Sequence, residues 1–245
     1  FKTKGFVFGV YMPLWLHSGA PRPPALLVVP SNYLRGIVAQ WGVRPERLMR
    51  IYLGIDFSEE PIMPTDVPDG KILFTLGRLV PWKGFAMLID LMHELPKEWH
   101  LVIAGDGPLR GELEKQADAI GIADRITFTG ALPRAEILGW YRAADAFALN
   151  TSFESFSFQV LEAMASGTPV IATNIGSLPE LITNGVEGVL CTPNDSEAFK
   201  EAILSTQSEA GAWQTQTDDA VRKARGFSVE TSVHAFADAV TKLCG

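Results

Sequence analysis

The chain has 245 residues, of which 47% are hydrophobic, so it is long enough and apolar enough to bury a sizeable core. Its formal net charge of −7 argues against nucleic acid as the main partner, because a phosphate backbone requires a basic face. The two cysteines, Cys191 and Cys244, show no metal-ligand spacing and indicate a reducing compartment rather than a disulfide framework.

The first apolar segment runs from Phe6 to Leu16 and is interrupted by Gly9 and Pro13. It falls short of the roughly 20 residues that a membrane-spanning helix needs, so no transmembrane segment is predicted. The segment could instead be a strand, a piece that packs against the terminal helix, or a surface on which another domain docks. A lone histidine such as His17 is more often incidental in such a segment than catalytic.

The next segment, Ala25 to Pro30, predicts a buried strand that leads into a helix capped by Ser31. Val43 to Arg47 and then Tyr52 to Asp56 follow, and we name this stretch the connection because it resembles an inter-domain connection. Four arginines make this part locally basic, which indicates either a solvated helix and loop or a contact with anionic lipid. They are Arg35, Arg44, Arg47 and Arg50.

From Lys71 to Leu204, short apolar runs alternate with helical patterns and with short loops bounded by Gly and Pro. Such alternation predicts an α/β fold with a doubly wound, Rossmann-like parallel sheet, whose ligand lies at the carboxyl ends of the strands. The predicted strands are Ile72–Leu76, Trp99–Ala104, Arg125–Thr129, Asp145–Leu149 and Pro169–Ala172.

Two cations, Arg78 and Lys83, follow the first of these strands, within Gly77-Arg78-Leu79 and Trp82-Lys83-Gly84. Arginine offers a planar fork of donors and lysine a point charge, and both suit phosphate oxygens. The alternative is a loop that simply carries solvated basic residues. After the second strand, Gly105 and Gly107 permit a tight turn before the next helix.

Two glutamates with seven residues between them, Glu154 and Glu162, follow the fourth strand. Ser155 and Ser157 lie where a helix should begin, and Phe158 to Ala165 has the apolar spacing of its buried face. One glutamate therefore precedes the helix and the other lies on it. Since a helix N-terminus presents unpaired N–H groups, a diphosphate can bind there while both carboxylates accept bonds from sugar hydroxyls. Solvated helices also carry such glutamate pairs.

The stretch from Asn150 to Ile182 closely resembles the donor-binding signature of family 4 (group 1) of the retaining glycosyltransferases, which have the GT-B architecture. This resemblance implies that Glu154 faces the transferred sugar and that Glu162 holds the ribose diol. It also implies that Arg78 and Lys83 bind the diphosphate.

The same resemblance implies further donor contacts after several strands. Arg134 lies where relatives line the nucleobase pocket, although it could equally be solvated. Ser177 stands where the family usually has a second glycine, which makes the identity of the donor less certain than the fold. Glu180 could bond a phosphate-side group or cap its own helix. The implied donor-binding residues besides Glu162 are Gly77, Gly105, Gly107, Arg134, Phe156, Ser157, Phe158, Gly176 and Ser177.

The resemblance implies transfer of a hexosyl group, with retention, from a nucleoside diphosphate sugar of the UDP or GDP type to an unknown saccharide or lipid-linked acceptor. It implies no metal and no cofactor, because Arg78, Lys83 and a helix dipole neutralise the leaving diphosphate. One alternative is a donor-binding module that transfers nothing without a partner. Another is a GT-B-shaped sugar-nucleotide epimerase, which the combined cation and glutamate pattern disfavours.

The predicted organisation is a partial N-terminal, acceptor-side domain with its connection (1–60), a donor-binding domain (61–227), and a terminal helix that crosses back (228–245). Only Phe1 to Pro24 precedes the first predicted strand, which is too short for a second full domain. We therefore expect an incomplete N-terminal domain, through truncation, natural minimality or a partner chain. The expected location is cytoplasmic, with a peripheral position at the inner membrane face as the alternative.

Overall fold

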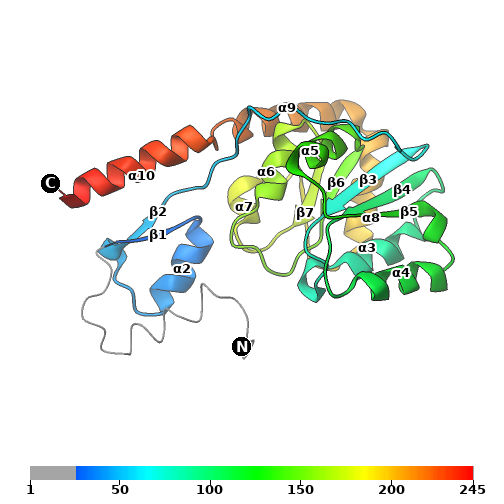
Figure 1. Ribbon diagram of the computed structural model, residues 1–245, viewed down its shortest axis with the longest axis horizontal. Helices are drawn as coiled ribbons and strands as arrows, with labels where there is room; N and C mark the ends of the chain where they lie inside the picture. Colours follow the sequence, from blue (N-terminus) through cyan, green and yellow to red (C-terminus); the bar gives the residue numbers. More distant parts are fainter. Residues whose placement is uncertain (1–25, 245) are drawn as a thin grey trace.

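The computed structural model describes residues 26–244 (Figure 1). The expectations for Phe6–Leu16 and His17 lie outside these residues. None of the described helices is long and apolar enough to cross a membrane.

A six-stranded parallel sheet forms the centre of the fold, with the strand order β5-β4-β3-β6-β7-β8 (Figure 1). This order reverses between β3 and β6, which is the topological switch point of a doubly wound sheet. The predicted fold class is confirmed, and so are the five predicted strands. The short sixth strand, β8, was not predicted. The strands are β3 (Lys71–Leu76), β4 (Trp99–Ala104), β5 (Ile126–Gly130), β6 (Ala146–Leu149), β7 (Val170–Thr173) and β8 (Val189–Cys191).

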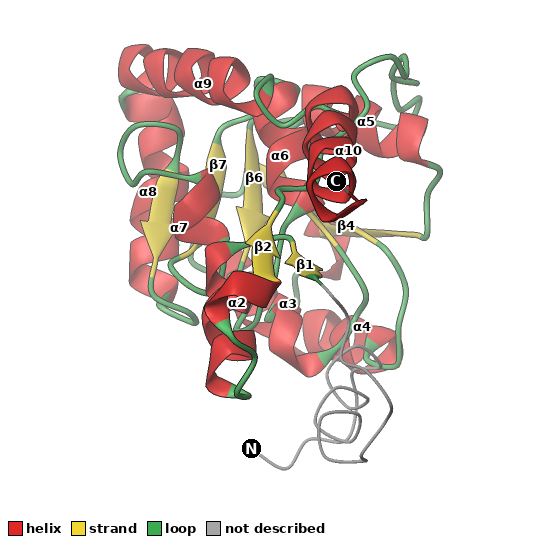
Figure 2. Ribbon diagram, turned by 90° about the vertical axis from the view of Figure 1, so that its left-hand side faces the viewer, coloured by secondary structure: helices red, strands yellow, loops and turns green. Residues whose placement is uncertain are grey.

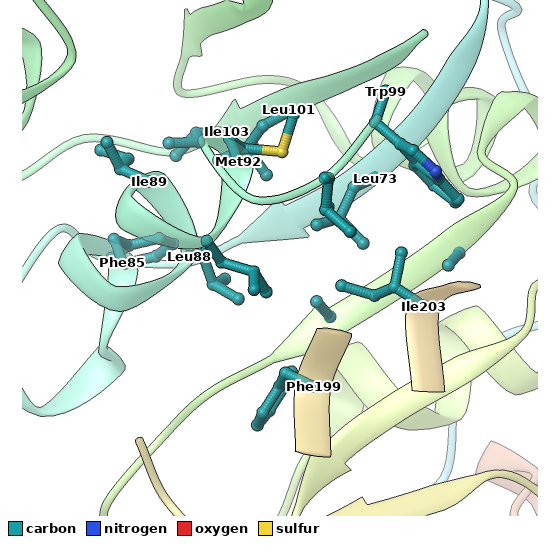
Figure 3. Packing of buried hydrophobic residues seen from close by; sticks show 14 of the residues in the cluster. Leu73, Phe85, Leu88, Ile89, Met92, Trp99, Leu101, Ile103, Phe199 and Ile203 are labelled. Atoms are coloured by element: carbon teal, nitrogen blue, oxygen red, sulfur yellow. The ribbon is translucent and has the colours of Figure 1, made fainter. Parts of the chain in front are cut away.

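Helices cover both faces of this sheet, because side chains that alternate along each strand point to opposite faces. Leu73 of β3 packs in one layer, whereas Ile72 and Phe74 pack in the other. Figure 3 shows the first layer, in which Leu73, Leu88 of α3 and Phe199 of α8 belong to one buried cluster. The helices of this part are α3 (Phe85–Met92), α4 (Arg110–Ala119), α5 (Arg134–Ala143), α6 (Phe158–Ala165), α7 (Leu178–Leu181), α8 (Ser196–Ser208) and α9 (Ala210–Ala224), with 3₁₀ turns η2 (Pro81–Lys83) and η3 (Ala123–Arg125).

A small N-terminal unit, which we define as residues 27–50, lies beside the sheet domain (Figures 1 and 2). Its two strands pair in parallel and share an apolar cluster with its helix. The Oγ of Ser31 accepts a hydrogen bond from the amide of Leu34, so the predicted cap is confirmed. The unit comprises β1 (Leu27–Val29), α2 (Asn32–Gln40), η1 (Pro45–Arg47) and β2 (Leu48–Arg50).

The last helix, α10 (Val229–Cys244), matches the predicted terminal helix and leaves the sheet domain on the side of the N-terminal unit (Figure 1). It begins beside the connection, where the amide of Ile55 donates to the carbonyl of Phe227 at 2.8 Å. The N-terminal unit and α10 therefore both lead away from the same side of the sheet domain.

Candidate functional site

The loops after β3 and β6 meet at the carboxyl edge of the sheet, because these two strands are neighbours at the switch point. Lys83, the last residue of η2, donates from Nζ to Oε2 of Glu154 at 2.9 Å. The two side chains are only 15% and 12% exposed. The structure thus brings together, largely buried, the cation and the carboxylate to which the resemblance assigned the diphosphate and the sugar.

A third side chain, Gln159, completes this group and was missed by the sequence analysis. Its Nε2 donates to the carbonyl of Leu76 at 2.8 Å, and its Oε1 lies 3.4 Å from Nζ of Lys83. Gln159 is the second residue of α6, whose other early residues are mostly apolar. A polar side chain in that position was the available signal. Gln159 links the tip of β3 to the lysine.

Arg78 lies at the tip of β3 and is exposed. It makes no ion pair or hydrogen bond with any residue in the described part of the chain. Its guanidinium can therefore bind an anion without first breaking a contact to a described residue.

The second glutamate, Glu162, lies on α6 and is held by Arg134. Nε of Arg134 donates to Oε1 of Glu162 at 2.8 Å, and Nη2 donates to the carbonyl of Asp56, also at 2.8 Å. The same guanidinium forms an ion pair with Glu59. Burial opposes the charge of Arg134, but the hydrogen bonds that it donates to Glu162 and Glu59, and their negative charges, outweigh burial and raise the pKa of Arg134. The prediction that Arg134 contacts the nucleobase is not tested by these contacts.

The N-terminus of α6 lies between the two glutamates. The Oγ of Ser157 accepts from the amide of Val160 at 3.3 Å, as a helix cap does. Phe156 is buried, with its ring 6.2 Å from that of Tyr52 and 5.5 Å from that of Phe158. Phe158 is exposed. Phe158 is therefore accessible to a ligand, whereas Phe156 supports the loop from inside.

Two of the predicted glycines bring the loops after β3 and β4 together. Gly105 has φ +121°, and a Cβ there would clash with the carbonyl of Gly77. A Cβ on Gly107 would come within 2.5 Å of the carbonyl oxygen of Leu79. The amide of Gly105 also donates to the carbonyl of Gly130 at 2.7 Å. Small residues at these positions allow the close approach of the backbones.

The loop after β7 packs against the backbone of Glu154. A Cβ on Gly176, which has φ +61°, would clash with the carbonyl of Glu154. The amide of Ser177 donates to that same carbonyl at 3.0 Å. The hydroxyl of Ser177 is buried and has no hydrogen-bond partner among the described residues. The loop thereby fixes the backbone that carries Glu154.

Glu180 does not cap its own helix, because no amide of α7 donates to its carboxylate, so that role is wrong. Its carboxylate instead accepts bonds from the amides of Asn32 and Tyr33 in α2. A bond from Glu180 to a phosphate-side group of the donor stays a prediction. Taken together, the edge of the sheet offers three cations (Arg78, Lys83 and Arg134), two carboxylates (Glu154 and Glu162) and a helix N-terminus. This set suits an anionic ligand that also carries hydroxyl groups.

Comparison with known proteins places the chain in a family. The family model described as "Glycosyl transferases group 1" matches residues 59–225, which is more than half of the chain. The lipopolysaccharide core biosynthesis mannosyltransferase LpsB of Rhizobium meliloti (strain 1021) is 32% identical over 181 residues, which are 69% of this chain and 51% of that protein. The D-inositol 3-phosphate glycosyltransferase of Xylanimonas cellulosilytica is 27% identical over 87% of this chain and 56% of that protein. The chain thus spans about half the length of these relatives.

Solved structures show the same architecture. The crystal structure of Anabaena Alr3699/HepE in complex with UDP-glucose has a TM-score of 0.83 at 27% identity, over 89% of this chain and 64% of that chain. The C-terminal domain of a glycosyl transferase group 1 family protein (LpcC) from Francisella tularensis has a TM-score of 0.62 at 25% identity, over 70% of this chain and 97% of that chain. With the parallel sheet and the group 1 match, these likenesses identify a GT-B fold, and the chain belongs to the group 1 glycosyltransferases.

Proposed function

We propose that the chain binds a nucleoside diphosphate sugar and transfers its hexosyl group, with retention, to an acceptor hydroxyl. The observation that carries this proposal is the largely buried pair of Lys83 and Glu154 near the N-terminus of α6, with Arg78 exposed in the same loop after β3 as Lys83. Cations and a helix N-terminus suit a diphosphate, and carboxylates suit sugar hydroxyls. The likeness to a protein crystallised with UDP-glucose supports the same ligand class.

The cations have the role of stabilising the departing diphosphate. Arg78 can bind it without losing a contact to any described residue, and Lys83 can turn from Glu154 toward a phosphate, since its ammonium sits on a flexible stem. No metal ion is needed in this proposal, because charge that develops on the leaving group meets Arg78, Lys83 and the amides near Ser157.

The carboxylates have the role of orienting the donor. Glu162 binds the ribose hydroxyls through its remaining lone pairs while Arg134 holds its Oε1. Glu154 binds the sugar and stabilises its oxocarbenium-like state electrostatically. The bond from the anomeric carbon to the phosphate oxygen breaks with its electron pair on the diphosphate. The acceptor oxygen bonds to the same face of that carbon, and its proton passes to the departing phosphate oxygen.

Calorimetric titration of the 245-residue chain with UDP, GDP and ADP tests the binding half of this proposal, and repetition with Glu162→Ala locates the site. We expect one nucleotide to bind selectively and the variant to bind it more weakly. Equal affinity in the variant would remove Glu162 from the site. Failure of all three nucleotides would overturn the proposal for this chain.

Transfer is tested separately, by following the release of UDP from UDP-glucose, or of GDP from GDP-mannose, with and without simple glycosides as acceptors. Release of nucleotide by the purified chain supports transferase chemistry. Binding without any release favours the donor-binding module, because the chain spans only about half of its curated relatives. Conversion of the donor sugar into an epimer would favour the epimerase.

A further inference from the structure

The N-terminal unit touches the sheet domain through Glu180, which the proposed function does not use. Oε1 of Glu180 accepts from the amide of Tyr33 and Oε2 from the amide of Asn32, both at 2.8 Å. The hydroxyl of Tyr52 donates to the same Oε2 at 2.9 Å. One carboxylate from α7 thus holds the first turn of α2 and the connection that follows β2.

Further contacts between the same two parts lie on either side of Glu154. The Oγ of Ser31, a fully buried residue, donates to the carbonyl of Ser155 at 2.7 Å. The rings of Tyr33 and Phe153 meet edge to face, with centroids 6.4 Å apart. The residues just before and just after Glu154 therefore both contact the N-terminal unit.

The chemistry of Glu180 makes it the strongest of these contacts. The first amides of a helix have no partner within the helix, and a carboxylate bonds them with charge assistance and with help from the helix dipole. Burial raises the pKa of Tyr52, and its hydrogen bond to Glu180 raises it further, so the hydroxyl remains a donor at neutral pH. All three partners therefore donate to Glu180.

We propose that Glu180 is a positioning residue that clamps the N-terminal unit onto the loop of Glu154 and thereby sets the affinity of the site for the sugar of the donor. This inference rests on the proposed function. Besides η2 with Lys83, two segments restrain the loop of Glu154: the loop after β7, through the amide of Ser177, and the N-terminal unit, through the carbonyl of Ser155. Glu180 joins these two segments to each other, and without it each restrains the loop less firmly.

The effect should be larger at the sugar end of the donor than at the ribose end. Glu162 is held by Arg134, which is held in turn by Glu59 and by the carbonyl of Asp56. None of these hydrogen bonds or ion pairs involves Glu180. Because binding energies at coupled sites are reciprocal, a bound sugar should also tighten the clamp.

The first test compares calorimetric affinities for UDP and UDP-glucose, with GDP and GDP-mannose as a second pair, in wild type, Glu180→Ala and Glu180→Gln. We expect Glu180→Ala to bind the nucleotide sugar about tenfold more weakly and the free nucleotide within about twofold of wild type. Glutamine keeps one acceptor oxygen and can donate to Tyr52, so Glu180→Gln should give an intermediate loss.

The matched control is Glu187→Ala. Glu187 also accepts a backbone amide, that of Thr183 at 2.7 Å, and pairs with Lys223 at 3.1 Å, but it contacts no residue of the N-terminal unit. Glu187→Ala therefore shows how the loss of a structural carboxylate near α7 by itself changes the two affinities. An unchanged ratio of sugar-nucleotide to nucleotide affinity in Glu180→Ala, or an equal change in Glu187→Ala, would overturn the positioning role.

Amide hydrogen exchange, followed by NMR, tests the clamp without any ligand. The amides of Asn32 and Tyr33 should exchange at least about tenfold faster in Glu180→Ala than in wild type and should be unchanged in Glu187→Ala. Unchanged exchange in Glu180→Ala would overturn the clamp itself. If wild type binds neither ligand pair, the proposed function and the sugar-positioning role both fail, and the exchange rates still decide whether Glu180 clamps.

Discussion

The two glutamates that frame the start of α6 differ in how their carboxylates are held. Glu154 is held by Lys83, whose ammonium has only one other polar contact among the described residues, with Gln159 at 3.4 Å, a long distance for a hydrogen bond. Glu162 is held by Arg134, which also binds Glu59 and the carbonyl of Asp56. One partner is a flexible ammonium, and the other is a planar fork with three acceptors.

This difference matters because a donor would affect the two ends of the site in different ways. Under the proposed function, a diphosphate would compete directly for the ammonium of Lys83, so Glu154 would change partners on donor binding. The guanidinium of Arg134 stays anchored by acceptors that belong to the connection, so Glu162 keeps its orientation with or without a ligand. Under the proposed function, the ribose side would therefore be pre-organised and the sugar side would rearrange on binding.

The largest expected effect is that of Glu154→Ala. Transfer should fall by about a hundredfold or more, the scale seen when one electrostatic contact to a transition state is removed. Affinity for free UDP or GDP should be equal to that of wild type or slightly higher, because Lys83 is released for the diphosphate. Product formation and calorimetry measure the two quantities, and a parallel loss of nucleotide affinity would place Glu154 on the phosphate side instead.

Glu162→Ala should have the next largest effect, on binding rather than on the rate of transfer. The loss of one charged acceptor for the ribose hydroxyls should weaken nucleotide binding by about thirtyfold. The affinities for the free nucleotide and for the nucleotide sugar should fall by the same factor, which calorimetry can compare. A selective loss of the sugar nucleotide would contradict the assignment of Glu162 to the ribose.

Arg134→Leu should weaken the nucleotide by about fivefold, because Glu162 then loses the guanidinium that fixes its orientation. Glu59→Gln is the milder control, since Arg134 keeps Glu162 and the carbonyl of Asp56. Glu59→Gln should lower the affinity for the nucleotide by no more than about twofold. In a double-mutant cycle, Arg134→Leu should add little to Glu162→Ala, and full additivity would show that Arg134 acts on the ligand directly.

The sheet and its loops were predictable from the sequence because apolar runs and Gly/Pro-bounded turns are local signals. β8 was missed since Val189–Cys191 is three residues long and partly buried at the sheet edge. The meeting of Lys83 with Glu154 follows from topology, because parallel strands present their following loops at one edge. The adjacency of β3 and β6 therefore predicts this contact, although no local sequence motif contains it.

The partners of single side chains were not predictable in the same way. Glu180 bonds amides that precede it by 148 and 147 residues, and nothing near it in the sequence points to α2. Arg134 likewise pairs with Glu59, across a connection with no regular periodicity. Such contacts depend on how the N-terminal unit and the connection fold back over the domain, which is a property of the whole chain.

The smallest expected effect tests whether Lys83 is held by Glu154 alone. Gln159→Val removes the hydrogen bond to the carbonyl of Leu76 and the contact with Lys83, which should cost about 1 kcal/mol of stability and about twofold in nucleotide affinity. Gln116→Val is matched, because Gln116 also donates from a helix to a backbone carbonyl, that of Ala86, away from the site. Urea unfolding and calorimetry should show a similar loss of stability in both variants and a loss of affinity only in Gln159→Val. Equal nucleotide affinities in wild type and Gln159→Val would mean that Glu154 alone holds Lys83. The difference from Arg134, which three acceptors hold, would then be larger.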